Sequence, residues 1–275
     1  MQAGPAHPDV EKGPSLASTR SSALPDEKHA ELISLIKEAD SVELKLTVPV
    51  SDRGRSAAAL GVDPLDAEIR QVYFFDTPDL ALNKKGLVVR ARRVRQKGDD
   101  TVVKLRPVVP SELPKQFRKS PSFGVEVDAM PGGFVCSGSM KRALATPDVR
   151  DAVHGNRPVR KLFSKDQRAL YEAYAPAGIE IDDLAILGPI FVLKLKWMPK
   201  GFGRKLVAEA WLYPDNTMLL ELSTKCSPTN AFQVAAETRA FLTERGVDLT
   251  SEQETKTKRA LEFFAKKLQA ESAAA

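Results

Sequence analysis

Five short segments carry pairs of charged residues spaced two apart, and this spacing restricts the fold more than any other feature of the chain. In Ser41–Val48, every even position is apolar and every odd position is polar. Side chains two apart on a β-strand lie on the same face. The five pairs are Glu43 with Lys45, Arg90 with Arg92, Lys104 with Arg106, Glu126 with Asp128, and Lys194 with Lys196. Most of these strands are apolar on the opposite face, which predicts a sheet with one charged face and one apolar face.

Strand signals recur along most of the chain. They fall at 41–48, 71–76, 86–96, 101–107, 123–129, 159–174, 179–186, 190–198, 204–213 and 217–224. Helical patterns fall at 26–38, around 56–61, in two short pieces over 139–154, and in two C-terminal helices that begin near Pro228 and Ser251. About ten strands predict an α+β protein that is mainly antiparallel β, built as a closed or nearly closed β-barrel with flanking helices. We expect a disordered tail over 1–24, the barrel domain over 25–228, and C-terminal helices packing on the barrel over 229–270.

Composition excludes several other classes of protein. The chain has 275 residues, of which 43% are hydrophobic and 28% charged, so it can bury a core and is not disordered throughout. It contains no apolar run of about 18 residues, which predicts no membrane span, and no apolar signal segment, which favours the cytoplasm. Only Cys136 and Cys226 are present, which excludes a disulfide framework or a cysteine zinc site.

Positive charge is concentrated in one stretch. Residues 84–119 contain 12 basic and three acidic residues, a net charge of +9 against +5 for the whole chain. One interpretation is a solvated basic face. If the charged pairs instead face into the barrel, the interior must be wet and must receive a polyanion, because unpaired buried ions are costly. Carboxylates in the same cavity would then need a divalent ion such as Mg²⁺ to bridge them to phosphate oxygens.

Three segments resemble the motifs of one family. Residues 73–93 read YFFDTPDLALNKKGLVVRARR, residues 103–107 read VKLRP, and residues 124–128 read GVEVD. In order and spacing, these resemble the CYTH superfamily, also called the triphosphate tunnel metalloenzymes. The resemblance covers about residues 41–224 and is more specific in the first half. It implies an eight-stranded antiparallel tunnel that binds triphosphate or polyphosphate compounds with Mg²⁺ or Mn²⁺.

The resemblance also implies roles for individual residues. Phosphate binding would fall to Lys45, Arg90, Arg92, Lys104, Arg106 and Arg168, with Lys194 and Lys196 as further candidates. Metal binding would fall to Glu43, Glu126, Asp128, Asp182, and Glu221 or Glu209. Lys165, near Arg168, is a candidate general base. Two expected carboxylates are absent, because Ser41 begins the first strand and Ser223 follows Glu221 in the last, so both departures affect metal ligands. Asp40 could replace the first of these only if a bulge turned it inward.

Three functions follow, in order of preference. The first is metal-dependent hydrolysis of a triphosphate compound, either inorganic triphosphate or a nucleoside or thiamine triphosphate. The second is a polyphosphate or nucleotide binding module with little turnover, which the missing carboxylates favour. The third is cyclisation of ATP, as in class IV-like adenylate cyclases, although no segment indicates a base-recognition pocket. Nucleic-acid binding is not favoured, because aromatic residues are only 7% of the chain and no stacking motif is present. The sequence indicates no oligomeric state.

Overall fold

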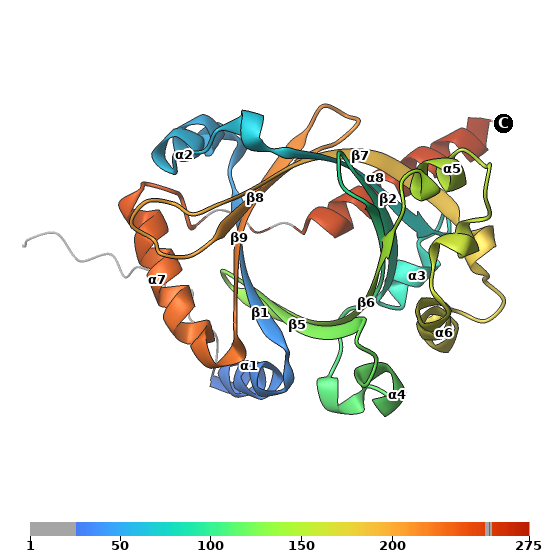
Figure 1. Cartoon of the computed structure of the whole chain (residues 1–275), viewed down its shortest axis with the longest axis horizontal. Coiled ribbons are helices and arrows are strands. Elements are labelled where there is room, and N and C mark those ends of the chain that lie inside the picture. The colour runs from blue at the N-terminus through green and yellow to red at the C-terminus, as the bar shows by residue number, and fades with distance from the viewer. Residues whose placement is uncertain (1–25, 251–252, 254, 275) are drawn as a thin grey trace, which may run out of the picture.

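The computed structural model describes residues 26–250, 253 and 255–274 of the chain. Nine strands form a closed barrel in the order β1-β5-β6-β4-β3-β2-β7-β8-β9, with β9 pairing back to β1. Figure 1 shows this ring of strands with helices around it. The strands are β1 (Ser41–Val48), β2 (Glu68–Asp76), β3 (Leu87–Val94), β4 (Asp99–Leu105), β5 (Phe123–Met130), β6 (Gly133–Leu144), β7 (Ala185–Trp197), β8 (Leu206–Leu212) and β9 (Met218–Cys226).

The barrel is mixed, because one pair of strands is parallel. β1 runs parallel to β5, with Glu43 opposite Asp128, and every other neighbouring pair is antiparallel. The predicted α+β fold with a closed, mainly antiparallel barrel is therefore confirmed. Four of the five charged pairs lie within strands, and Arg106 follows the last residue of β4.

Helices lie before the first strand, in the connections between strands, and after the last strand. They are α1 (Asp26–Glu38), α2 (Arg53–Ala59), α3 (Ala81–Lys84), α4 (Lys115–Arg118), α5 (Asp148–Val153), α6 (Lys165–Tyr174), α7 (Ala231–Glu244) and α8 (Lys256–Ala274). Short 3₁₀ turns are η1 (Val50–Asp52), η2 (Pro64–Asp66), η3 (Pro110–Glu112), η4 (Val159–Leu162), η5 (Ile181–Asp183) and η6 (Pro228–Asn230). None of the described helices is long and apolar enough to span a bilayer.

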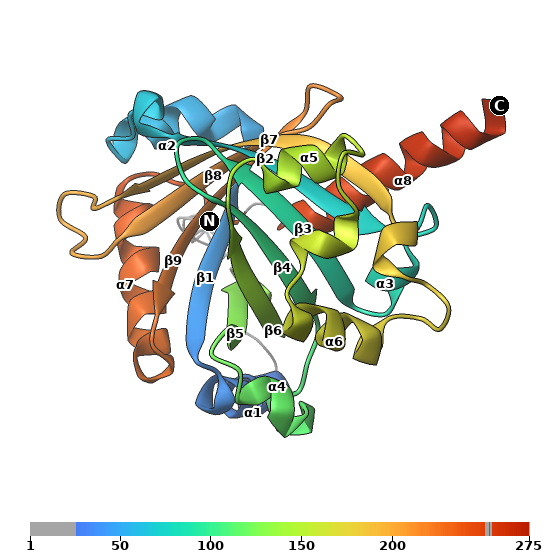
Figure 2. The same cartoon turned by 45° about the vertical axis from the view of Figure 1, so that its right-hand side comes forward.

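The apolar face of the strands points outward and is covered by helices. Val89, Val103 and Val127 lie in one buried cluster with Ile36 of α1 and Leu170 of α6. Figure 2 shows α5 and α6 beside β3, β4 and β6, and α7 beside β9. Because alternate side chains on each strand point the other way, this outward core leaves the charged face inside the barrel.

One end of the barrel interior is filled by α8. Leu261 and Phe264 of this helix are buried against Phe74 of β2, Ile190 of β7 and Trp211 of β8. In Figure 1 the first turn of α8 lies within the ring of strands. A tunnel open at both ends therefore does not describe this barrel, because a helix closes one of its mouths.

Three segments differ from the sequence-based prediction. Residues 179–186 were expected to form a strand of their own, but they contain η5, and β7 begins only at Ala185 and continues to Trp197. Residues 133–144 form strand β6, although part of this stretch was expected to be helical; its glycines and serines break the alternation of apolar and polar residues. Residues 159–174 were expected to form a strand but form η4 and α6, and this prediction was wrong. A capping box between Ser164 and Gln167 starts α6, and Gln167 donates to the Met140 carbonyl of β6.

Two terminal predictions lie beyond what the structure describes. The tail at 1–24 falls outside the described residues, as do Ser251 and Glu254, the expected capping box of the last helix. The division into domains stays a prediction.

Leu261→Ala tests whether α8 is an integral part of the barrel core. Leu261 is 2% exposed, and we expect its truncation to lower the free energy of unfolding by about 2–5 kcal/mol because it leaves a cavity. The same substitution at Leu65, which is 92% exposed, is the matched control and should change stability by less than about 0.5 kcal/mol. Urea unfolding of both variants measures the difference, and equal stabilities would contradict the packing role of α8.

Candidate functional site

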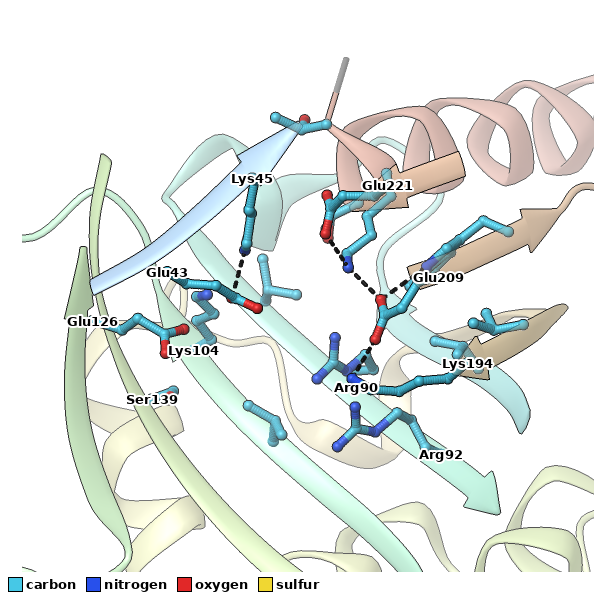
Figure 3. Close-up of a pocket in the computed structure, with 18 of the residues that line it drawn as sticks. Glu43, Lys45, Arg90, Arg92, Lys104, Glu126, Ser139, Lys194, Glu209 and Glu221 are labelled. Atoms are coloured by element: carbon cyan, nitrogen blue, oxygen red, sulfur yellow. Dashed lines mark hydrogen bonds and ion pairs between the residues drawn. The ribbon is translucent and has the colours of Figure 1, made fainter. Parts of the chain in front are cut away.

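The charged face of the barrel lines a cavity of about 430 Å³. Eleven basic and four acidic side chains line it, a surplus of seven positive charges. The basic residues are Lys45, Arg70, Arg90, Arg92, Lys104, Arg106, Lys141, Lys194, Lys196, Lys225 and Lys256, and the acidic residues are Glu43, Glu126, Glu209 and Glu221. Figure 3 shows the labelled members of this set, among them Lys45, Arg90 and Glu209, projecting from several strands towards a common space. Such a concentration of charge in a concave, partly desolvated site strongly attracts anions.

Asp128 lies buried behind this cavity and holds three cations. Its side chain is 0% exposed, and its oxygens lie 2.7 Å from Lys45 Nζ, 3.5 Å from Lys104 Nζ and 3.6 Å from Arg106 Nη2. Burial alone would raise the pKa of Asp128, but the three cations lower it well below its usual range. Asp128 therefore stays ionised and fixes the positions of three basic groups.

The positive charge of Lys104 is only partly balanced by Asp128. The Lys104 side chain is 22% exposed, so little water reaches the ammonium group. Burial is the main cause that lowers the pKa of Lys104 to about 8. The neighbouring Lys45 and Arg106 act in the same direction, and Asp128 opposes them. A group in this state gains stability when an anion binds beside it, since the anion favours its charged form.

Three carboxylates at this end of the cavity could hold a metal ion. Glu43, Glu126 and Asp128 each offer one oxygen, and these oxygens lie within 4.8 Å of one another. Neither Asp128 oxygen accepts a hydrogen bond of ordinary geometry, although both are buried. Carboxylate oxygens are the ligands that Mg²⁺ and Mn²⁺ prefer. We call these three residues the acidic cluster, and their chemistry fits a divalent cation.

The two serines that replace expected carboxylates orient this cluster. Ser41 Oγ donates to Glu126 Oε2 at 3.3 Å, and Ser223 Oγ donates to Glu43 Oε1 at 3.1 Å. Asp40 does not take their place, because its carboxylate accepts the Val125 backbone N–H at 2.7 Å and helps join β1 to β5. The serines thus preserve the geometry of the remaining ligands without contributing charge.

A second group of cations lies away from the acidic cluster, on β2, β3 and β7. Arg90 projects into the cavity from β3, and its buried Nε has no hydrogen-bond partner among the described residues. Burial lowers the pKa of Arg90 to about 10, and the adjacent Arg92 adds to this effect. Arg92 differs, because its Nε donates to Asp100 at 2.8 Å. A buried guanidinium without a partner is costly unless a ligand anion supplies one.

Glu209 and Glu221 lie on the wall between the two groups of cations. Lys194 Nζ lies 2.5 Å from Glu209 Oε1, and Lys256 of α8 contacts both glutamates. Burial would raise the pKa of Glu209, but Lys256 and Lys194 hold it well below its usual range. Glu209 is therefore ionised, and both carboxylates already contact cations from the protein.

The segment 76–86 positions the arginine strand β3 by backbone hydrogen bonding. The buried carboxylate of Asp76 accepts the backbone N–H groups of Thr77, Leu82 and Asn83, which fixes the start of α3. Gly86 then turns the chain into β3 with φ +73°, and a Cβ there would lie 2.6 Å from the Arg106 carbonyl oxygen. Arg106 is consequently held against the start of β3 by its own backbone.

Most of the predicted site residues come together, and three do not. Lys45, Arg90, Arg92, Lys104, Arg106, Lys194, Lys196, Glu43, Glu126, Glu209 and Glu221 all line the cavity, with Asp128 buried beside it. Lys165 and Arg168 lie on α6 outside the barrel, where Arg168 donates to the Phe163 carbonyl at 2.7 Å. Asp182 lies in η5 and pairs with Arg160. The reason is that residues 159–174 form η4 and α6 and residues 181–183 form the turn η5, so neither segment is a strand of the barrel.

Four basic residues of the cavity were missed by the sequence analysis: Arg70, Lys141, Lys225 and Lys256. Arg70 and Lys225 lie just beyond the predicted ends of β2 and β9, and extending the alternation of these strands would have included them. Lys141 lies in β6, part of which was expected to be helical. Lys256 reaches the cavity from α8, and no sequence pattern indicates that a helix enters the barrel.

Asp128→Asn tests the role of the buried carboxylate. The substitution removes the counter-charge that Lys45, Lys104 and Arg106 share, although Lys45 keeps its contact with Glu43. We therefore expect it to lower the free energy of unfolding by about 3–5 kcal/mol. Added inorganic triphosphate should recover part of this loss, because it supplies the missing negative charge. Asp79→Asn, at an exposed pair with Lys84, is the control and should have little effect. Chemical denaturation with and without the anion measures both effects, and an Asp128 variant as stable as wild type would contradict them.

No protein-family model matches the chain, and no curated protein matches it significantly. Solved structures do. A putative adenylate cyclase from Bacillus halodurans shares 14% identity, with a TM-score of 0.56 over 80% of this chain and 97% of that one. A putative adenylyl cyclase from Hippeastrum, HpAC1, described as having a dominant triphosphatase activity, shares 16% identity. Its TM-score is 0.55, and the match covers 77% of this chain and 91% of that one.

At these identities the comparisons concern the fold. Both matches extend over more than three quarters of this chain and nearly the whole of the other protein. The chain therefore shares the closed-barrel fold of these two structures.

Proposed function

We propose that this protein hydrolyses a triphosphate compound in the barrel cavity with the help of a divalent metal ion. The observation that carries the proposal is the buried, unpartnered Arg90 Nε in a cavity with seven surplus positive charges. A highly charged anion would balance this surplus, and a triphosphate chain is a compact ligand of that kind. The similarity in fold to HpAC1, described with a dominant triphosphatase activity, supports hydrolysis over cyclisation.

The two groups of cations suit the two ends of a triphosphate chain. Arg90, Arg92 and Lys194 would bind phosphoryl oxygens on one side of the cavity, and Lys45, Lys104 and Arg106 on the other. Each charge-assisted contact contributes roughly 1.5–3 kcal/mol. Because the strands and the buried Asp128 fix these groups in advance, little reorganisation accompanies binding.

The acidic cluster would hold the divalent ion beside the bound phosphates. Such an ion polarises a phosphoryl group and neutralises charge on its oxygens. The side chains of Arg90, Lys104 and Arg106 would hold the triphosphate in place and stabilise charge on the equatorial oxygens. The bridging oxygen of the broken phosphoanhydride bond leaves with the product, and water supplies the new oxygen atom. Phosphoryl transfer of this type depends mainly on positioning and electrostatic stabilisation.

A binding module with little turnover is the second candidate, and specific contacts favour it. Lys45 lies 3.0 Å from Glu43 and 2.7 Å from Asp128, and Lys225 pairs with Glu126. Every member of the acidic cluster therefore already contacts a lysine. If these lysines compete successfully with the metal ion, the cavity would bind polyphosphate without cleaving it.

Turnover of inorganic triphosphate, ATP and thiamine triphosphate with Mg²⁺, Mn²⁺ or EDTA tests the proposal. We expect metal-dependent phosphate release from at least one substrate, and a loss of kcat/KM of roughly a hundredfold or more in Arg90→Ala. Arg95→Ala removes an exposed arginine one residue beyond the same strand and should retain activity. Tight polyphosphate binding without turnover would favour the binding module, and cyclic AMP formation from ATP would favour the cyclase.

The pH dependence of binding tests the state of Lys104. With EDTA present, the affinity for inorganic triphosphate should fall as the pH rises from about 7 to about 9.5, because Lys104 loses its proton near pH 8. The sign follows from the lowered pKa: below about 8 the ammonium group is charged and attracts the anion, and above it the attraction is lost. The expected fall is about tenfold.

Lys104→Arg is the matched control, because arginine stays charged over this range. Titration of the ligand itself affects both proteins equally, so their difference isolates Lys104. Isothermal titration calorimetry at a series of pH values gives both curves. Parallel curves for wild type and Lys104→Arg would contradict the prediction.

A further inference from the structure

Two carboxylates face each other across neighbouring strands in the wall of the cavity. Glu209 of β8 and Glu221 of β9 are register partners, and their side chains are 10% and 7% exposed. Like charges directly opposite each other in a sheet repel, and burial strengthens the repulsion. The pair therefore requires a cation between its members.

The cation in this structure is the ammonium group of Lys256. Its Nζ lies 2.7 Å from Glu221 Oε1 and also contacts Glu209 Oε2. Glu221 and Glu209 therefore share this single nitrogen. The Lys256 side chain is 17% exposed, so little water competes for these contacts.

The surroundings of Glu209 leave little room for another ligand. Its Oε1 is 2.5 Å from Lys194 Nζ, and its Oε2 accepts the Trp211 indole N–H at 3.2 Å in addition to contacting Lys256. The ammonium group of Lys256 also lies 5.4 Å from the centre of the Trp211 ring.

Lys256 is held in place by the helix that carries it. It is the first residue of α8, whose Leu261 and Phe264 are buried in the closed end of the barrel. The Tyr213 hydroxyl donates to the Lys256 carbonyl at 3.1 Å. Just before the helix, Gln253 Oε1 accepts the Thr47 backbone N–H of β1 at 2.8 Å. The position of the ammonium group is thus fixed by the packing of α8 and by hydrogen bonds at Lys256 itself and at Gln253, just before the helix.

We propose that Lys256 is a built-in cation that occupies the position where Glu209 and Glu221 would otherwise bind a divalent metal ion. The inner wall then offers a metal site at the acidic cluster and withholds one at the Glu209–Glu221 pair. The proposal rests on the proposed function in one respect, namely that divalent ions enter this cavity. Its consequence is a change in metal stoichiometry that can be counted without any enzymatic turnover.

Mn²⁺ binding to the full-length protein tests the proposal. Free Mn²⁺ is measured by electron paramagnetic resonance at about 0.15 M salt, where weak surface binding is screened. We expect Lys256→Met, which keeps the length of the side chain and removes its charge, to bind one more Mn²⁺ per chain than wild type. Lys256→Arg keeps the charge and should show no gain. Lys258→Met, at a lysine whose side chain is 71% exposed on the same helix, should also leave the count unchanged.

A triple variant, Lys256→Met with Glu209→Gln and Glu221→Gln, places the extra ion. It should lose the gained Mn²⁺, because its two amides no longer attract a cation. Thermal unfolding provides a second readout: Mn²⁺ should raise the Tm of Lys256→Met more than that of wild type.

The outcomes separate this inference from the proposed function. If wild type binds no Mn²⁺ in the absence of triphosphate and Lys256→Met binds one, the role of Lys256 stands, and the acidic cluster does not hold the ion without the anion. An unchanged count in folded Lys256→Met overturns the inference. A wild-type protein that binds Mn²⁺ at the Glu209–Glu221 pair, shown by loss of one ion in Glu209→Gln/Glu221→Gln, overturns it without reference to any Lys256 variant.

Discussion

The structure depends on the direction in which its strands present their apolar faces. Val89, Val103 and Val127 point outward and are buried beneath α1, α5 and α6, so the hydrophobic core surrounds the barrel. The interior must then hold the charged face, and it does so at a considerable electrostatic cost, since eleven basic side chains share one cavity. Burial of apolar surface in the outward core offsets this electrostatic cost, because it contributes roughly 25 cal/mol per Å². A charged interior of this kind is suited to binding an anionic ligand.

Within the cavity, the protein balances part of its charge and leaves part unbalanced. Asp128 compensates Lys45, Lys104 and Arg106, while Glu209 and Glu221 are compensated by lysines from two different elements. Arg90 remains without a hydrogen-bond partner at Nε. The carboxylates thus hold cations at fixed positions, and the cations without a carboxylate partner are available to a ligand. This is electrostatic preorganisation, in which the protein meets the cost of assembling the charges when it folds.

The sequence predicted the strands with regular alternation and failed where alternation is absent. Residues 41–48 and 87–94 show a clear period of two, and their inward residues were correctly grouped. β6 contains Gly133, Ser137, Gly138 and Ser139, so its burial cannot be derived from apolar periodicity alone. Residues 159–174 were assigned to a strand although Ser164 and Gln167 form a helix start, and this error placed Lys165 and Arg168 on the wrong side of the barrel wall. Lys256 could not be predicted, because its position depends on how α8 packs into the barrel end, a contact between residues far apart in the chain.

The charge of the cavity bears on how a metal ion could enter it. A divalent cation approaching the acidic cluster meets Lys45 and Lys225 at the same carboxylates and seven surplus positive charges overall. Its binding to the empty cavity is therefore opposed, whereas the proposed triphosphate ligand would reverse the local potential and draw the lysines towards its phosphate oxygens. The same linkage requires the metal ion to strengthen triphosphate binding by an equal factor. Metal and triphosphate would then bind as a coupled pair. The lysines that contact the acidic cluster would make its occupation by the metal ion conditional on bound substrate.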